Sequence, residues 1–165
     1  MRDRVVKIRR ATVADAERVS ALLREVALQF IVDEFDGLGR ARYLQQLAPK
    51  ATAKRLAGKD FRCLVAEDSS AMVGVVALQG NWHLYHLVVA KEYQRGGLAR
   101  RLWQLLRDEV LGADPPRNFK ANVPRYAIGA YMRLGFKADG PTRKEKGAHF
   151  QPMTCPVLLE APQGK

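Results

Sequence analysis

The run from Gln94 to Ala99, with the sequence QRGGLA, has the residue types and spacing of an anion-binding turn. It follows an apolar, strand-like stretch from Leu84 to Val89 and opens a strongly amphipathic helix. The first turn of a helix leaves backbone N–H groups without partners and carries partial positive charge. Glycines allow a ligand to approach the backbone closely because they have no Cβ. We therefore expect this turn to hold a phosphate or a pyrophosphate.

The run matches neither of the common nucleotide-binding motifs. A Walker loop requires the pattern G-x-x-x-x-G-K-[ST], and a dinucleotide fingerprint requires three glycines in the pattern G-x-G-x-x-G. The pattern in this chain is Q-x-x-G-x-A. On these six residues alone, an ordinary strand-to-helix turn is the alternative interpretation.

Two histidines, His83 and His86, lie in the strand that leads to this turn. Strict alternation along a strand predicts that His83 shares a face with Tyr85 and Leu87, and that His86 lies on the other face with Leu84. Histidine titrates near neutral pH, so either side chain suits the deprotonation of an ammonium group. A purely structural histidine is the alternative for both.

Composition indicates one globular domain over residues 1–165, because the chain has 165 residues and 47% of them are hydrophobic. No stretch reaches the ~20 apolar residues that a membrane span needs, and the start lacks the apolar segment of a signal peptide. A cytoplasmic protein is the expectation. The two cysteines, Cys63 and Cys155, lie neither in a C-x-x-C pair nor beside a histidine cluster, so we expect no metal.

The formal charge of +11 favours a polyanionic partner. Nucleic acid and coenzyme A, with its phosphates, are both polyanions. The basic residues gather over residues 2–10, 95–101 and 143–146, and only the middle group coincides with the predicted phosphate site. We therefore interpret that group as serving a phosphate ligand and do not expect nucleic acid as the partner.

Apolar periodicity and turn residues predict an α/β domain with a mixed sheet, in which hairpins come first and crossover connections follow near the glycine turn. Helices are predicted at about 13–30, twice within 35–56, at 98–110, and from Pro124 to Gly135. Strands are predicted at 5–9, 62–67, 72–78, 82–89, 119–123, 136–138 and 150–159. The helix residues predicted to pack are Leu38, Tyr43, Leu44 and Leu47, and then Leu98, Leu102, Leu105, Leu106 and Val110.

Several segments, in this order, resemble the GNAT superfamily of N-acetyltransferases. Residues 8–16 resemble its opening strand and helix, residues 66–74 its central hairpin, and residues 87–99 its acetyl-CoA motif, Q/R-x-x-G-x-G/A. Residues 131–136 match its late Tyr-x-x-Leu-Gly-Phe segment, while 121–127 and 147–153 resemble a bacterial branch. The resemblance implies a GNAT fold: a mixed, mostly antiparallel central sheet with a splayed strand pair, flanked by helices.

The resemblance also implies a site for acetyl-CoA. Its pantetheine arm would lie in the gap beside the strand ending at Val89 and pair with the backbone of Leu87 and Val89, much as an added strand would. Arg95 departs from the commonest form of the turn, which has glycine there and a basic residue next. The residues implied in acetyl-CoA binding are Leu87, Val88, Val89, Gln94, Arg95, Gly96, Gly97, Leu98, Ala99, Arg100, Asn122, Ala127 and Tyr131.

Acetyl transfer needs a neutral amine, a polarised thioester carbonyl and a proton for the departing thiolate. By the resemblance, the N–H of Val89 polarises the carbonyl and Tyr131 is the general acid, although periodicity alone makes Tyr131 a core residue. His83 and Glu67 are candidates for the general base. Reaction with an amine already neutral in solution, without a dedicated base, is the further alternative.

The resulting hypothesis is an N-acetyltransferase that transfers the acetyl group of acetyl-CoA directly to a primary amine in a ternary complex. The acceptor is expected to be a small molecule, with a protein amine left open. The alternative is a non-catalytic module on the same fold that senses acyl-CoA or binds nucleic acid. The sequence leaves the oligomeric state open, a homodimer included.

Overall fold

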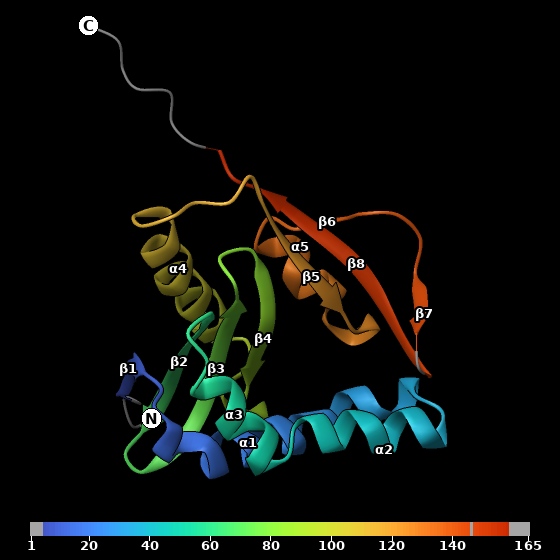
Figure 1. Ribbon diagram of the computed structural model, residues 1–165, viewed down its shortest axis with the longest axis horizontal. Coiled ribbons are helices and arrows are strands. Elements are labelled where there is room, and N and C mark those ends of the chain that lie inside the picture. The colour runs from blue at the N-terminus through green and yellow to red at the C-terminus, as the bar shows by residue number, and fades with distance from the viewer. Residues whose placement is uncertain (1–4, 146, 159–165) are drawn as a thin grey trace, which may run out of the picture.

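The computed structural model describes residues 5–145 and 147–158. Within these residues one eight-stranded sheet has the order β1-β2-β3-β4-β5-β8-β6, and β7 pairs with β8 (Figure 1). The strands are β1 (Val6–Arg10), β2 (Phe61–Asp68), β3 (Ala71–Gln79), β4 (His83–Val89), β5 (Asn118–Val123), β6 (Lys137–Ala138), β7 (Arg143–Glu145) and β8 (Ala148–Pro156). The sequence predicted each of these strands except β7.

The sheet is antiparallel from β1 to β4 and again from β5 through β8 to β6. Strands β4 and β5 are parallel and share one register pair, His83 with Lys120. Beyond that pair the two strands separate. The predicted α/β fold, with a mixed, mostly antiparallel sheet and one splayed strand pair, is therefore confirmed.

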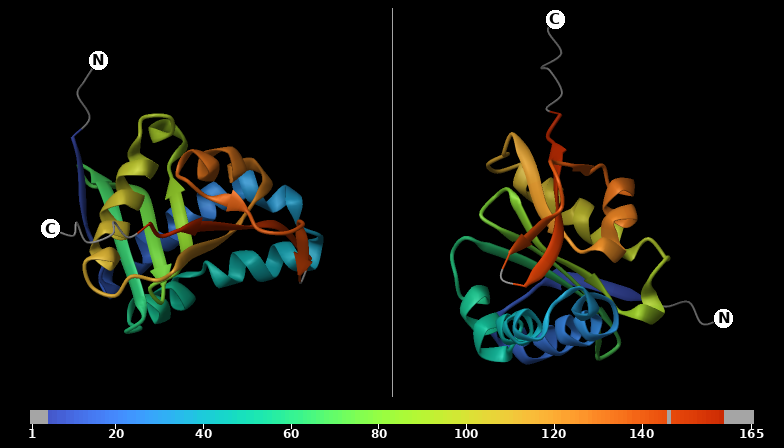
Figure 2. Two further views of the ribbon diagram at one scale, coloured as in Figure 1. Left: turned by 90° about the horizontal axis from the view of Figure 1, so that it is seen from above. Right: turned by 90° about the vertical axis from the view of Figure 1, so that its right-hand side faces the viewer.

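Two groups of helices cover the sheet. The helices are α1 (Ala16–Val26), α2 (Gly37–Gln46), α3 (Pro49–Leu56), α4 (Leu98–Leu111) and α5 (Ile128–Arg133). One core cluster packs α1 and the end of α2 on the sheet, and a second cluster packs α4 and α5. The right-hand view in Figure 2 shows the sheet between these groups, with α1 to α3 below it and α4 and α5 above.

Local sequence explains how the first helices begin. Thr12 and Asp15 form a capping box, and a single turn of 3-10 helix leads into α1. The carboxylate of Asp36 accepts a hydrogen bond from the N–H of Gly39 at 2.7 Å, which caps α2. Both predicted helices within 35–56 are therefore present, and the first begins at Gly37.

The predicted packing of Leu38 is wrong, because this side chain is 64% exposed. Tyr43, Leu44 and Leu47 do pack against the core, as predicted. At about 100° per residue, Leu38 lies on the opposite side of α2 from these three. The prediction grouped Leu38 with these residues because all four are apolar or aromatic, without taking account of its angular position on the helix.

The predicted stripe on α4 needs a similar correction. Leu98, Leu102, Leu106 and Val110 are buried, but Leu105 is 45% exposed. Each four-residue step advances about 40° around the helix, so the buried face drifts away from Leu105. The indole of Trp103 fills the core instead and packs edge-on against Phe119, with ring centroids 4.9 Å apart.

Candidate functional site

A cavity of about 450 Å³ lies beside the separated end of β4. It extends from the glycine turn before α4 to α5 and the short 3-10 turn, Arg125–Ala127, that precedes α5. Its lining residues are Leu87, Val89, Tyr93, Gln94, Arg95, Gly97, Leu98, Ala99, Arg100, Tyr126, Ala127, Ala130, Tyr131, Arg133 and Leu134. Most residues predicted from the resemblance are therefore brought together along one cavity.

The backbone of β4 presents polar groups to the gap between β4 and β5. The N–H of Ala90 donates to the carbonyl of Val73 on β3 at 2.8 Å. In an antiparallel ladder, hydrogen-bonding residues alternate, so the N–H groups of Leu87 and Val89 point the other way, into the gap. These two groups are available to an extended ligand lying along the strand.

The glycine turn has two residues in the left-handed backbone conformation. Gly97, the N-cap of α4, has φ of +82°, and an added Cβ there would meet no atom within 4 Å. Arg95 has φ of +66°. Arg95 occupies the position at which the commonest form of the turn has glycine, and glycine would adopt this backbone conformation without strain. Arg95 nevertheless lines the cavity, which gives its basic side chain a place beside the expected phosphates.

A guanidinium contact joins the two helices on either side of the cavity. The Nη2 of Arg100, in the first turn of α4, donates to the carbonyl of Arg133 at the end of α5, at 2.9 Å. Both side chains line the cavity with Arg95. Sequence reasoning missed Arg133, and its only signal was its basic character within the Tyr-x-x-Leu-Gly-Phe segment.

Tyr131 is buried in α5 and its side chain lines the cavity. Its ring packs edge-on against Phe136, with centroids 5.5 Å apart. Burial raises the pKa of its phenol, and the nearby hydroxyls of Tyr126 and Tyr43 raise this pKa further. The hydroxyl is therefore protonated at neutral pH, as a proton donor must be. Tyr126, which stacks on Phe30 at 5.2 Å, was not found from the sequence.

The predicted alternation of the two histidines is wrong. The register of β3 and β4 shifts, so that His86 lies opposite Ala77 while Leu84 lies opposite Leu78. Such a bulge inserts one extra residue and reverses the alternation beyond it. His83 and His86 consequently lie on the same face of β4, and Tyr85 between them contacts both rings, at centroid distances of 5.7 and 4.5 Å.

The environments of the two histidines differ. Burial lowers the pKa of His86 to about 3, with the positive charge of Arg55 as the next cause, so this ring is neutral and only weakly basic. Burial also lowers the pKa of His83, whose ring stacks on Trp82 at 5.3 Å. His83 marks the point where β4 and β5 still pair, at the closed end of the gap.

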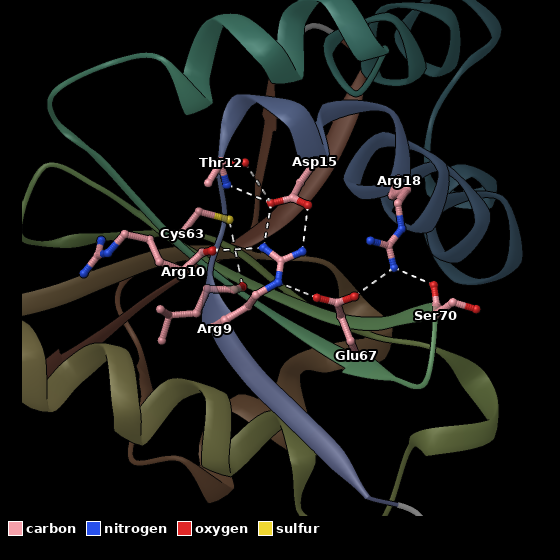
Figure 3. A network of polar contacts seen from close by, with 9 residues as sticks. Arg9, Arg10, Thr12, Asp15, Arg18, Cys63, Glu67 and Ser70 are labelled. Atoms are coloured by element: carbon pink, nitrogen blue, oxygen red, sulfur yellow. Dashed lines mark hydrogen bonds and ion pairs between the residues drawn. The ribbon is translucent and has the colours of Figure 1, made fainter.

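Glu67 takes part in an ion-pair network at the other edge of the sheet (Figure 3). Its carboxylate accepts hydrogen bonds from Arg9 and from Arg18, the latter at 3.1 Å. These two bonds lower the pKa of Glu67. A carboxylate held ionised by two guanidinium groups on β2, two strands from β4, is poorly suited to accept a proton from an amine.

Three further predicted residues lie outside the main cavity. Val88 packs on the opposite face of β4, against the α1 cluster. Asn122 is exposed on β5, opposite Pro152 of β8. Gly96 lines a neighbouring cavity of about 310 Å³ on the other side of the glycine turn. Of the basic residues noted in the sequence, Arg2, Arg4 and Lys146 lie outside the described residues.

Two further features of the described residues bear on other classes of site. Among residues 5–145 and 147–158, no group of three or more His, Cys, Asp or Glu side chains could hold a metal ion. In the same part of the chain, every helix is too short or too polar to cross a bilayer. The two cysteines, both buried, are free thiols.

These features define an α/β fold in which a phosphate-type turn follows a splayed strand. A family model described as "Acetyltransferase (GNAT) domain" matches residues 25–157. The chain belongs to the GNAT acetyltransferase family. No curated protein sequence matches this chain.

Solved structures of the same fold include several N-acetyltransferases. The chain is similar to PaiA N-acetyltransferase from Thermoplasma acidophilum in complex with coenzyme A, at 16% identity and a TM-score of 0.79, covering 93% of this chain and 99% of that one. It is also similar to a GCN5-related N-acetyltransferase from Rhodopseudomonas palustris, at 20% identity and a TM-score of 0.78, covering 95% of this chain and 99% of that one. A third similar structure is the ribosomal-protein-S18-alanine N-acetyltransferase from Escherichia coli, at 18% identity and a TM-score of 0.66, covering 98% of this chain and 99% of that one.

Proposed function

We propose that this protein transfers the acetyl group of acetyl-CoA to a primary amine by direct attack in a ternary complex. The observation that carries the proposal is the cavity that joins the glycine turn to Tyr131 along the open edge of β4. Its two ends suit the two ends of the coenzyme, because one offers helix N-terminal amides and the other a phenol. Family membership and a coenzyme A complex of a protein with the same fold support the choice of ligand.

In this proposal the first amides of α4, from Gly97 onward, bind the pyrophosphate. The guanidinium groups of Arg95, Arg100 and Arg133 add positive charge around the same end of the cavity. The pantetheine amides then pair with the backbone groups of Leu87 and Val89 that face the gap, as an added strand would. The chain thus holds the thioester near Tyr131.

The transfer itself requires two proton movements. The amine nitrogen forms a bond to the thioester carbon, and the C–S bond breaks. The N–H of Val89 polarises the carbonyl oxygen, and the hydroxyl of Tyr131 gives its proton to the departing sulfur. The proton released by the amine goes to solvent or, through water, to His83. The products are an N-acetylated amine and the free thiol of coenzyme A.

The alternative of a nucleic-acid-binding module has less support. Several basic side chains outside the cavity are already paired with carboxylates. Arg9 and Arg18 bind Glu67, while Arg10 and Arg62 bind Glu109. Arg95 lines the cavity and, within residues 5–145 and 147–158, forms no ion pair, which favours a small phosphate ligand over an extended polyanion.

The test is an acceptor screen combined with calorimetry. Purified protein is titrated with acetyl-CoA and then incubated with acetyl-CoA and a panel of primary amines. Coenzyme A release is followed by thiol detection, and the acetylated amine is identified by mass spectrometry. Saturable binding and an acetylated product support the proposal. Absence of acetyl-CoA binding, or a steeply salt-dependent affinity for nucleic acid in its place, would contradict it.

A further inference from the structure

All the charged residues in the segment that forms α2 and α3 are basic. Residues 37–59 contain no Asp or Glu, whereas the chain as a whole contains 17 such residues. This segment lies on the face of the sheet that carries α1, opposite α4 and the glycine turn (Figure 2). The cations of this segment are Arg40, Arg42, Lys50, Lys54, Arg55 and Lys59.

A cavity of about 510 Å³ lies at the corner between these two helices. Its lining residues are Arg42, Gln45, Gln46, Ala51 and Arg55. Guanidinium and carboxamide N–H groups are hydrogen-bond donors, and no carboxylate is among these lining residues. The donor set therefore suits an anion with two or more oxygens, such as a carboxylate.

Arg55 has a donor for which the described part of the chain supplies no acceptor. Its Nη2 donates to the main-chain carbonyl of Gln46, and its guanidinium carbon lies 5.2 Å from the centre of the Tyr85 ring. Its Nη1 is buried and has no hydrogen-bond partner within the described residues. A buried donor left unsatisfied is destabilising, and a buried cation more so, unless a ligand supplies the acceptor.

Arg55 lines this cavity and also contacts β4, the strand whose open edge lines the reaction site. Tyr85, below the guanidinium, belongs to β4, and its ring contacts that of His86 at 4.5 Å. Leu87 and Val89, whose N–H groups face the gap, follow two and four residues later. At roughly 3.3 Å per residue, they lie about 7–13 Å along the strand from Tyr85. An acceptor that follows β4 over this distance would reach from Arg55 to the thioester.

We propose that the amine acceptor carries a carboxylate at its far end, and that Arg55 binds this carboxylate. This inference rests on the proposed acetyl transfer and names the class of its substrate. The amine and the carboxylate must be separated by a spacer, because a simple α-amino acid is too short to span from Arg55 to the thioester. The rings of Tyr85 and Phe61, in edge-on contact at 5.9 Å, offer an apolar wall to that spacer.

Two matched pairs of amines test this assignment on the wild-type protein. One pair is para-(aminomethyl)benzoate and benzylamine, and the other is ε-aminocaproate and pentylamine. In each pair the members differ by the carboxylate alone. We expect kcat/KM to favour the carboxylated member by about tenfold or more, because hydrogen bonds between ionised groups commonly reach that value. Equal values within both pairs would overturn the inference.

Variants then assign the preference to Arg55. In Arg55→Gln we expect a higher KM for the carboxylated amines, an unchanged kcat, and no change for benzylamine or pentylamine. Lys54→Gln is the matched control, because this exposed cation on α3 does not line the cavity. It should leave the preference intact. A loss of equal size in both variants would mean that general charge attracts the acceptor, and a loss for all amines in Arg55→Gln would mean a structural role.

Calorimetry separates failure of this inference from failure of the proposed function. Binding of para-(aminomethyl)benzoate is measured in the presence of coenzyme A, which requires no turnover. Binding that is lost in Arg55→Gln supports the inference. Binding of para-(aminomethyl)benzoate and benzylamine with equal affinity contradicts the inference while leaving acetyl transfer in place. Failure to bind coenzyme A at all would instead contradict the proposed function.

Discussion

The carboxamide of Gln94 donates through Nε2 to the main-chain carbonyl of Val89, at 3.0 Å. Val89 is the last residue of β4, and Gln94 opens the glycine turn. The bond closes the short connection between them, which contains one 3-10 turn over Lys91–Tyr93. It also occupies the Val89 carbonyl, so that the N–H groups of Leu87 and Val89 are the donors left to the gap. The position of the turn is thus fixed relative to the open strand edge.

Replacing Gln94 should therefore weaken the binding of acetyl-CoA with little effect on the fold. Gln94→Ala removes one hydrogen bond, worth about 0.5–1.5 kcal/mol, so we expect the dissociation constant to rise about two- to tenfold. Gln94→Glu should be worse, since a carboxylate repels both the Val89 carbonyl and the pyrophosphate. Calorimetric titration with acetyl-CoA measures both. Equal affinity in wild type and Gln94→Glu would show that the bond does not shape the site.

The two glycines of the turn should respond differently to alanine. Gly97→Ala places a side chain at φ of +82°, which costs about 1–2 kcal/mol, and adds a methyl group at the mouth of the cavity. Gly96→Ala is the control, because its Cβ would meet only the Tyr93 carbonyl at 3.8 Å. We expect acetyl-CoA affinity to fall in Gly97→Ala and to change little in Gly96→Ala, with far-UV circular dichroism unchanged in both. The same loss in both variants would contradict this placement.

Arg95 combines an unfavourable backbone conformation with a favourable charge. Arg95→Gly should raise the free energy of unfolding by about 1 kcal/mol, because glycine adopts φ of +66° without strain. It should at the same time lower acetyl-CoA affinity through loss of the guanidinium group. Arg95→Ala separates the two effects, since it removes the charge and keeps the strain. Denaturant unfolding and calorimetry on both variants give the comparison, and a destabilised Arg95→Gly would contradict it.

Much of the site was predictable because it is encoded locally. The glycine turn, the strand before it and the helix after it are contiguous in the sequence, and residue type alone indicates an anion site there. The predicted role of Tyr131 as general acid rests on the family resemblance, because periodicity alone predicts a core residue there. Tyr131 is both buried and part of the cavity wall, so a core position is compatible with access to the cavity, and its role as general acid stays a prediction.

The features that escaped prediction depend on long-range register and packing. The bulge in β4 arises from its pairing with β3, so the sequence alone could not place His83 and His86 on one face. The bond between Arg100 and the Arg133 carbonyl joins residues 33 positions apart. Arg55 likewise reaches Tyr85 only because α3 packs against α1 and β2, on the face of the sheet that carries α1. Such contacts have no signature in residue spacing.

The ion pair between Arg9 and Asp15 should make folding sensitive to acid. Two hydrogen bonds of 2.8 Å join them, and the bond from Arg9 is the main cause that lowers the pKa of Asp15 from 3.8 to about 2. A carboxylate with a lowered folded-state pKa contributes stability that is complete above its unfolded pKa and disappears as the pH falls through the folded pKa. Asp15 should therefore stabilise the fold above about pH 4 and cease to do so near pH 2.

Asp15→Asn tests this dependence. At neutral pH we expect the variant to lose about 1–2 kcal/mol of unfolding free energy, less than the full pKa shift implies because Arg9 is partly exposed. Its difference from wild type should shrink as the pH falls from about 4 to 2. Asp108→Asn is the control, since its contact with Arg107 at 3.7 Å is exposed and should contribute little. A difference that stays constant over this pH range would refute the assignment.

Tyr131→Phe tests the proton donor. The ring would keep its edge-on contact with Phe136, so the fold and the affinity for acetyl-CoA should be nearly unchanged. Turnover should fall by about 10²–10⁴-fold, because the thiolate would leave without its general acid. The loss should be seen in kcat at saturating amine and acetyl-CoA, under conditions where chemistry limits the rate.

Tyr126→Phe is the matched control for that experiment. Tyr126 lines the same cavity and stacks on Phe30, and its phenol also has a raised pKa, to about 12, through burial. If any phenol lining the cavity served equally, the two variants would lose the same activity. We expect Tyr126→Phe to retain most of its turnover, because the match to the family motif falls on Tyr131. Equal rates in wild type and Tyr131→Phe would assign that residue to packing and leave coenzyme A to depart as the thiolate.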